Sequence, residues 1–134
     1  MFLDQDGNVE ELGGMNVVFV FKDGTVVTPE SPSILEGITR DSLLQLAEDR
    51  GYTVEKRPIS IDEWREGVAS GDIVEVFACG TAAVVTPIGV LKGKDFIDEQ
   101  PTGTLALELR QELTDIQYGR AADKHNWLLR LDAP

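Results

Sequence analysis

The stretch "MNVVFVFKDGTVVTP" (residues 15–29) decides the fold. Its first seven residues form a nearly continuous apolar run of β-branched and aromatic side chains, which is typical of a strand buried on both faces. Asp23 and Gly24 then favour a tight turn, and "TVVTP" returns as a second strand. The stretch therefore predicts a β-hairpin whose first strand lies inside the protein.

The segment after this hairpin predicts a helix with an unusual start. A loop over residues 29–33, "PESPS", leads into a helix that Gly51 ends. Residues 37–39, Gly-Ile-Thr, place backbone N–H groups and a hydroxyl at the positive end of the helix dipole, which is a favourable place for an anion. The side chains that we expect this helix to direct toward a core are Leu43, Leu44, Leu46 and Ala47.

A strand and a second helix come next. Residues 53–59 alternate in polarity, so we expect a half-exposed strand. Ser60 and Glu63 have the spacing of a capping box, in which the serine caps a helix and the glutamate lies three residues on. This helix is short, because Gly71 follows it.

The C-terminal half continues the alternation of strands and helices. Two apolar, strand-like runs are separated at residues 79–81, and a turn follows at residues 92–93. An amphipathic helix is expected over residues 102–116, with Gly119 stopping it. Together these patterns predict a mixed α/β fold in which residues 1–134 form a single domain.

The composition excludes several classes of function. The chain has 134 residues, of which 42% are hydrophobic, and a net charge of −12, which disfavours nucleic acid and anionic membrane surfaces as partners. One cysteine (Cys79) and one histidine (His125) cannot form a zinc cluster, so we expect no metal site. No apolar run approaches the roughly 18 residues of a membrane span, and the N-terminus does not resemble a signal peptide. We therefore expect a cytoplasmic protein.

Two segments before residue 40 suit a binding site. In "EELGGMN" (residues 10–16), two glycines allow a tight turn that would bring Glu11 beside a large group; the alternative is a loop with surface glutamates. At residues 37–39 the helix start could hold an anion, or the Thr39 hydroxyl could simply cap the helix.

A third segment is "FACGTAAVV" (residues 77–85), where small residues interrupt two strands. Their N–H groups and small side chains allow a phosphate or carboxylate to approach closely, although a β-bulge would explain them equally well. Cys79 is expected to be a small buried apolar residue, because no histidine lies near it in the sequence. The residues alone supply no nucleophile with a base and no dinucleotide-binding glycine pattern.

Taken together, these segments resemble the C-terminal half of branched-chain amino acid aminotransferases, which are fold-type IV pyridoxal-phosphate enzymes. The similarity extends over "EELGGMNVVFVF", "SILEGITRDSLLQLA", "EVFACGTAAVVTP" and "LTDIQYGR" (residues 113–120), in the order and spacing of the family. It implies the C-terminal domain of the D-amino acid aminotransferase-like fold, a sheet or pseudo-barrel with flanking helices. "GGMN" and "LTDIQYGR" favour this branch over D-amino acid transaminases and aminodeoxychorismate lyases.

The resemblance implies a role in binding pyridoxal 5′-phosphate. Glu11 corresponds to the glutamate that pairs with the pyridine nitrogen and keeps it protonated, so that the ring can accept electrons. Thr81 corresponds to a phosphate donor. The turn that holds the ring face and the phosphate corresponds to Leu35, Gly37, Ile38 and Thr39.

The resemblance also implies the substrates. Gly14 and Ala82 correspond to positions whose backbone lies against the α-carboxylate of the substrate. The parent enzyme would be a homodimer that transfers an amino group between leucine, isoleucine or valine and 2-oxoglutarate, with glutamate as the other product.

Two departures from the family pattern matter. Ala83 and Thr86 replace the redox pair of cysteines that mammalian members carry. None of the five lysines matches the family lysine that forms the Schiff base with the cofactor. We therefore expect a fragment that lacks the N-terminal domain, provides no catalytic residue and is inactive alone. We also expect the segments 15–21 and 77–85 to expose apolar surface.

Two alternatives to this activity stay open. The chain could belong to a related fold-type IV enzyme, either a D-amino acid transaminase or an aminodeoxychorismate lyase. It could instead be a non-catalytic module that binds a phosphorylated ligand or a partner protein through the same segments.

Overall fold

The computed structural model describes most of the chain, and its strands and helices alternate as predicted from the sequence, with additional short strands at residues 2–3, 9–11 and 97–99 that were not predicted. The described residues are 2–11, 15–30, 37–80 and 84–128. In chain order the elements are β1 (Phe2–Leu3), β2 (Val9–Glu11), β3 (Asn16–Phe21), β4 (Thr25–Thr28), α1 (Ile38–Asp49), β5 (Thr53–Lys56), α2 (Ile61–Ser70), β6 (Ile73–Gly80), β7 (Val84–Pro87), β8 (Val90–Lys92), β9 (Ile97–Glu99) and α3 (Leu105–Gln117).

The predicted hairpin forms the centre of the main sheet. This sheet has five strands in the order β5-β4-β3-β6-β7, and two smaller sheets pair β1 with β2 and β8 with β9. β3 is antiparallel to both β4 and β6, whereas β4 and β5 are parallel. Because α1 lies between β4 and β5 in the chain, it provides the crossover that parallel neighbours need.

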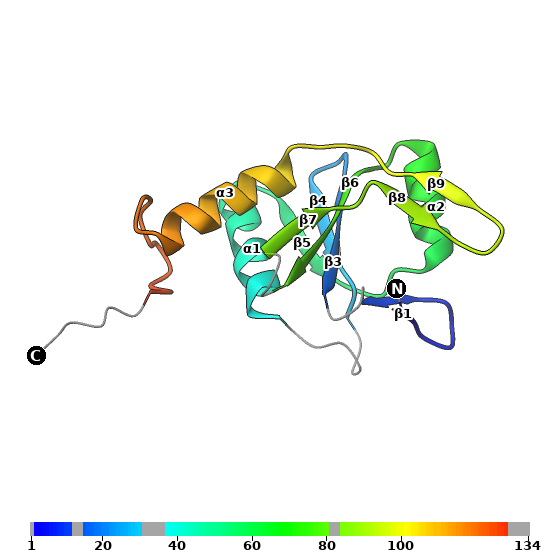
Figure 1. Cartoon of the computed structure of the whole chain (residues 1–134), viewed down its shortest axis with the longest axis horizontal. Coiled ribbons are helices and arrows are strands. Elements are labelled where there is room, and N and C mark those ends of the chain that lie inside the picture. The colour runs from blue at the N-terminus through cyan, green and yellow to red at the C-terminus, as the bar shows by residue number, and fades with distance from the viewer. Residues whose placement is uncertain (1, 12–14, 31–36, 81–83, 129–134) are drawn as a thin grey trace, which may run out of the picture.

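Helices cover both faces of the sheet (Figure 1). Val18 and Val20 of β3 belong to a buried cluster with residues of α1 and α3, while Val17 and Phe19 belong to a second cluster with Trp64 of α2. Successive side chains of a strand point to opposite faces, so this division shows that β3 is buried on both. The predicted mixed α/β fold, a sheet with flanking helices, is confirmed.

The ends of the helices follow the local signals. The Ser60 Oγ atom accepts a hydrogen bond from the backbone N–H of Glu63 at 2.9 Å, as a capping serine does. Gly71 follows α2 with a φ of 83°, and Gly51 follows α1 with a φ of 93°. This left-handed conformation strains other residues, which explains why glycine ends both helices.

Three expectations need correction. The strand predicted over residues 53–59 ends at Lys56, because Pro58 has no N–H to donate to a neighbouring strand. The helix predicted from residue 102 begins at Leu105, where a carboxylate from β6 accepts its first N–H groups. Residues 17–20 and 77–79 are at most 3% exposed, so these residues do not form the apolar surface expected of the segments 15–21 and 77–85, of which residues 81–83 lie outside the described ranges.

Candidate functional site

The start of β3, the start of α1 and the end of β6 meet at one end of the main sheet. Asn16, the first residue of β3, is paired with Cys79 of β6. A Cβ atom added to Gly37 would lie 2.5 Å from the Asn16 Oδ1 atom, so only a glycine fits against that side chain as it stands. Asn16 is 7% exposed, which makes this a contact inside the protein.

The small-residue segment arrives at the same end of the sheet. Gly80, the last residue of β6, is paired with Val84 at the start of β7. A Cβ atom added to Gly80 would lie 3.1 Å from the Met15 Cγ atom, which is closer than an ordinary van der Waals contact. The described residues that border all three predicted segments are therefore brought together.

The predicted site residues are described to different extents. Gly37, Ile38 and Thr39 are described in full at the start of α1. The backbone of Glu11 ends β2, but its side chain is outside the description. The predicted residues that lie outside the described ranges are Gly14, Leu35, Thr81 and Ala82.

The start of α1 differs from an ordinary capped helix. Gly37 is the N-cap residue with extended backbone angles (φ −75°, ψ 139°), and as a glycine it has no side chain that could accept a hydrogen bond from the first turn. Thr39 is the second residue of the helix and therefore is not its N-cap residue, which was the alternative interpretation of this segment. The side chain of Ile38 is 85% exposed. The first turn therefore contributes backbone N–H groups beside a residue without a side chain.

A buried arginine in this turn was missed by the sequence analysis. Arg40 is 1% exposed, and its Nε and Nη2 atoms donate to the Asp41 Oδ1 atom at 3.2 and 3.1 Å. A signal was present, because Arg40 has the helical spacing of the apolar residues Leu43, Leu44 and Ala47 and so extends their face by one turn.

Cys79 is a buried apolar residue, as predicted. Burial raises the pKa of its thiol to about 12, although the charge of Arg40 opposes this rise and that of Asp41 adds to it. A thiol with such a pKa stays protonated at neutral pH and does not act as a nucleophile. The contributions of Arg40 and Asp41 also indicate that the first turn of α1 lies close to the end of β6.

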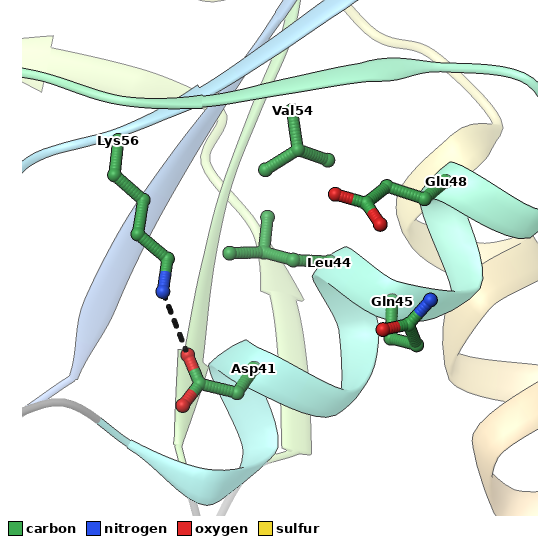
Figure 2. A pocket seen from close by; sticks show the side chains of 6 residues that line it. All are labelled: Asp41, Leu44, Gln45, Glu48, Val54 and Lys56. Carbon is green, nitrogen blue, oxygen red and sulfur yellow. Dashed lines mark ion pairs between the residues drawn. The ribbon is translucent and has the colours of Figure 1, made fainter. Parts of the chain in front are cut away.

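A small pocket beside this turn lies between α1 and β5 (Figure 2). Its volume is about 200 Å³, and the Lys56 Nζ atom lies 3.8 Å from the Asp41 Oδ1 atom across it. The two charged side chains point toward one another and pair, so we assign no ligand to this pocket. Its lining residues are Asp41, Leu44, Gln45, Glu48, Val54 and Lys56.

Two other kinds of feature are not found in the described part of the chain. Its side chains contain no group of three histidine, cysteine, aspartate or glutamate residues that could hold a metal ion. None of its helices combines the length and the apolar character needed to cross a bilayer.

Comparison with known proteins gives consistent matches. The family model for amino-transferase class IV matches residues 1–91. The branched-chain-amino-acid aminotransferase of Mycolicibacterium smegmatis is 54% identical over 132 residues, which cover 92% of this chain and 36% of that protein. The chain thus spans about a third of the length of this curated relative.

Solved structures agree with this match. The T.th. branched-chain amino acid aminotransferase with pyridoxamine 5′-phosphate has a TM-score of 0.77 and 35% identity; the match covers 96% of this chain and 40% of that one. The same enzyme complexed with N-(5′-phosphopyridoxyl)-L-glutamate also has a TM-score of 0.77 and 35% identity, and here the match covers 96% of this chain and 41% of that one.

Proposed function

The chain belongs to the amino-transferase class IV family, and from this membership we propose that it is the cofactor-binding part of a branched-chain amino acid aminotransferase. The observation that carries the proposal is the meeting of Asn16, Gly37 and Gly80 at one end of the main sheet. Each borders or belongs to one of the three segments that the sequence predicts to form a binding site. Segments far apart in the sequence are therefore arranged as a cradle would require.

The described residues fit the phosphate of pyridoxal 5′-phosphate or pyridoxamine 5′-phosphate. A helix start presents backbone N–H groups and the positive end of a dipole, which together favour a phosphate. At α1 the N-cap residue is Gly37, which is packed so closely against Asn16 that a larger residue at position 37 would displace the Asn16 side chain. We propose that the N–H groups of Ile38 and Thr39, with the Thr39 hydroxyl, bind the phosphate.

The remaining cofactor contacts are proposed from the resemblance to the family. Pyridoxal phosphate, when bound, supplies an electron-accepting ring for amino-group transfer. We propose that the Glu11 carboxylate keeps a proton on the pyridine nitrogen and that Leu35 contacts the ring face. Thr81 is proposed as a second phosphate donor. The backbone at Gly14 and Ala82 is proposed to lie against the α-carboxylate of the substrate.

The proposed substrates are leucine, isoleucine or valine together with glutamate or 2-oxoglutarate. The name of the Mycolicibacterium smegmatis relative supports the first group, and the glutamate derivative in the T.th. enzyme supports the second. We also propose that residues 1–134 form one domain of a cytoplasmic homodimer. The catalytic lysine is proposed to lie in a part of the protein outside these residues.

A comparison of two proteins tests this function. The first is the 134-residue chain, and the second is the product of the complete reading frame that contains it. We expect the longer protein to form glutamate from leucine and 2-oxoglutarate, with much slower turnover of D-alanine and aminodeoxychorismate. The 134-residue chain is expected to bind pyridoxamine 5′-phosphate more tightly than pyridoxamine and to leave leucine unchanged. Equal affinity for the two compounds would overturn the cofactor proposal, and preferred turnover of D-alanine would overturn the substrate proposal.

A further inference from the structure

Arg40 is the only buried cation in the described part of the chain, and it lies directly after the proposed phosphate-binding residues. A guanidinium loses much hydration free energy on burial, so its position must be compensated by ionic partners and hydrogen bonds. Arg40 lies on the buried face of α1, at a position where the helical spacing predicts an apolar residue. A role beyond filling that core is therefore worth testing.

Asp41, the ionic partner of Arg40, connects the first turn of α1 to a strand. The Nε and Nη2 atoms of Arg40 donate to the Asp41 Oδ1 atom, which also lies 3.8 Å from the Nζ atom of Lys56, the last residue of β5. Figure 2 shows the Lys56 and Asp41 side chains pointing toward one another between the strand and the helix. The chain of charges Arg40–Asp41–Lys56 thus links the start of α1 to the edge of the main sheet.

Helix α1 also packs against the end of β6. Cys79 belongs to the buried cluster that contains Leu43 of α1, and the charge of Arg40 acts on its thiol. On the other side, Gly37 touches Asn16, which is paired with Cys79. The first turn of α1 is therefore fixed from both sides at the place where β3 and β6 meet.

We propose that Arg40 is a positioning residue, which anchors the first turn of α1 so that the N–H groups of Ile38 and Thr39 stay aimed at the cofactor phosphate. The inference rests on the proposed function. Helix ends fray readily, and hydrogen bonds to an anion depend steeply on direction. Moving this turn would displace a buried guanidinium and separate Asp41 from Lys56, so both interactions hold the turn in place.

Cofactor binding provides the first test, in which dissociation constants are measured for pyridoxamine 5′-phosphate and for pyridoxamine. We expect Arg40→Met to reduce the preference for the phosphorylated compound by about tenfold, since losing one charge-assisted hydrogen bond has roughly this effect. Arg40→Lys is expected to restore part of the preference. Arg50→Met is the matched control, because Arg50 lies at the other end of α1 and pairs with Glu108 and Glu112.

The ratio of the two affinities separates positioning from general destabilisation. A variant that is merely less stable loses affinity for both compounds alike, and its ratio stays unchanged. If Arg40→Met keeps the preference of the wild-type chain, the inference is wrong while the proposed function stands. If the wild-type chain shows no preference, the proposed function fails, and the role in phosphate binding fails with it.

A second test works without cofactor. Cys79 is the only cysteine of the chain and is 0% exposed, so its rate of labelling by a thiol reagent reports opening of this region. We expect Arg40→Met to accelerate labelling by about tenfold, and Arg50→Met to leave it unchanged. Labelling no faster in Arg40→Met than in Arg50→Met would overturn the positioning role, whatever the binding data.

Discussion

The first backbone N–H groups of a helix need hydrogen-bond acceptors, and the starts of α3 and α1 differ in what provides them. Glu75 of β6 is 3% exposed and accepts hydrogen bonds from the N–H groups of Leu105 and Ala106 at 3.1 and 2.8 Å. A carboxylate 30 residues earlier in the chain thereby caps α3. At α1 the N-cap residue is Gly37, which has no side chain to accept a hydrogen bond.

This difference separates a structural helix start from a functional one. The start of α3 obtains its acceptor inside the fold, so its cap serves stability. The start of α1 has a glycine at a position where a larger side chain would not fit, followed by a buried arginine. We propose that the acceptor for its N–H groups is a phosphate. Substitutions at the two starts should consequently change different quantities.

Glu75→Ala should have the largest effect, on the free energy of unfolding. It removes the acceptor of two buried N–H groups at the start of α3, and we expect a loss of about 2–3 kcal/mol in urea unfolding. Glu108→Ala is the control, because Glu108 lies in the first turn of the same helix with a 53% exposed side chain. Equal losses in the two variants would show that the hydrogen bonds of Glu75 contribute little.

Gly37→Ala should have a smaller effect on stability and a clear one on binding. The new Cβ atom would lie 2.5 Å from the Asn16 Oδ1 atom, so the buried amide must move. We expect a loss of about 1 kcal/mol in unfolding free energy, with a reduced preference for pyridoxamine 5′-phosphate over pyridoxamine. Gly89→Ala is the matched control, because a Cβ atom there meets nothing within 4 Å. An unchanged preference in Gly37→Ala would contradict a phosphate site at α1.

Local features of the fold were predictable because their signals lie within a few residues. Ser60 caps α2 through Glu63, and Gly51 and Gly71 follow their helices as expected. The hairpin of β3 and β4 was likewise encoded by one apolar run and one turn. These elements depend on backbone preferences and hydrophobic period, which a single sequence contains.

Features that depend on distant partners were not predictable in this way. Glu75 looked like a polar residue of a strand, because nothing near it in the sequence reveals the start of α3. Arg40 could be suspected from its helical spacing, but its neighbour Cys79 is far away in the chain. For the site, the residues suggested an anion at Gly37 and near Thr81 and a large group beside Glu11, and the cofactor itself came from the resemblance to the family.

The smallest expected effect is a pH dependence that distinguishes the two starts. Burial raises the pKa of Glu75 above its ordinary value of 4.5, with a further contribution from the charge of Glu108, although the hydrogen bonds from Ala106 and Leu105 oppose the rise. The Glu75 carboxyl group therefore binds its proton more tightly in the folded state than in the unfolded state. The stability it contributes is complete below pH 4.5 and is lost as the pH rises through the raised pKa.

Glu75→Gln removes this titration and keeps a neutral acceptor at the same place. The free energy of unfolding of the wild-type chain minus that of the variant should be highest below pH 4.5, fall as the pH rises and then level off. Urea unfolding at a series of pH values measures this difference, in which the other titrating groups cancel. If this difference in unfolding free energy instead grows with pH, the N–H groups of Leu105 and Ala106 stabilise the Glu75 carboxylate more than burial destabilises it. The start of α3 would then prefer a charged acceptor, as we propose for the start of α1, and the contrast between them would reduce to the source of that charge.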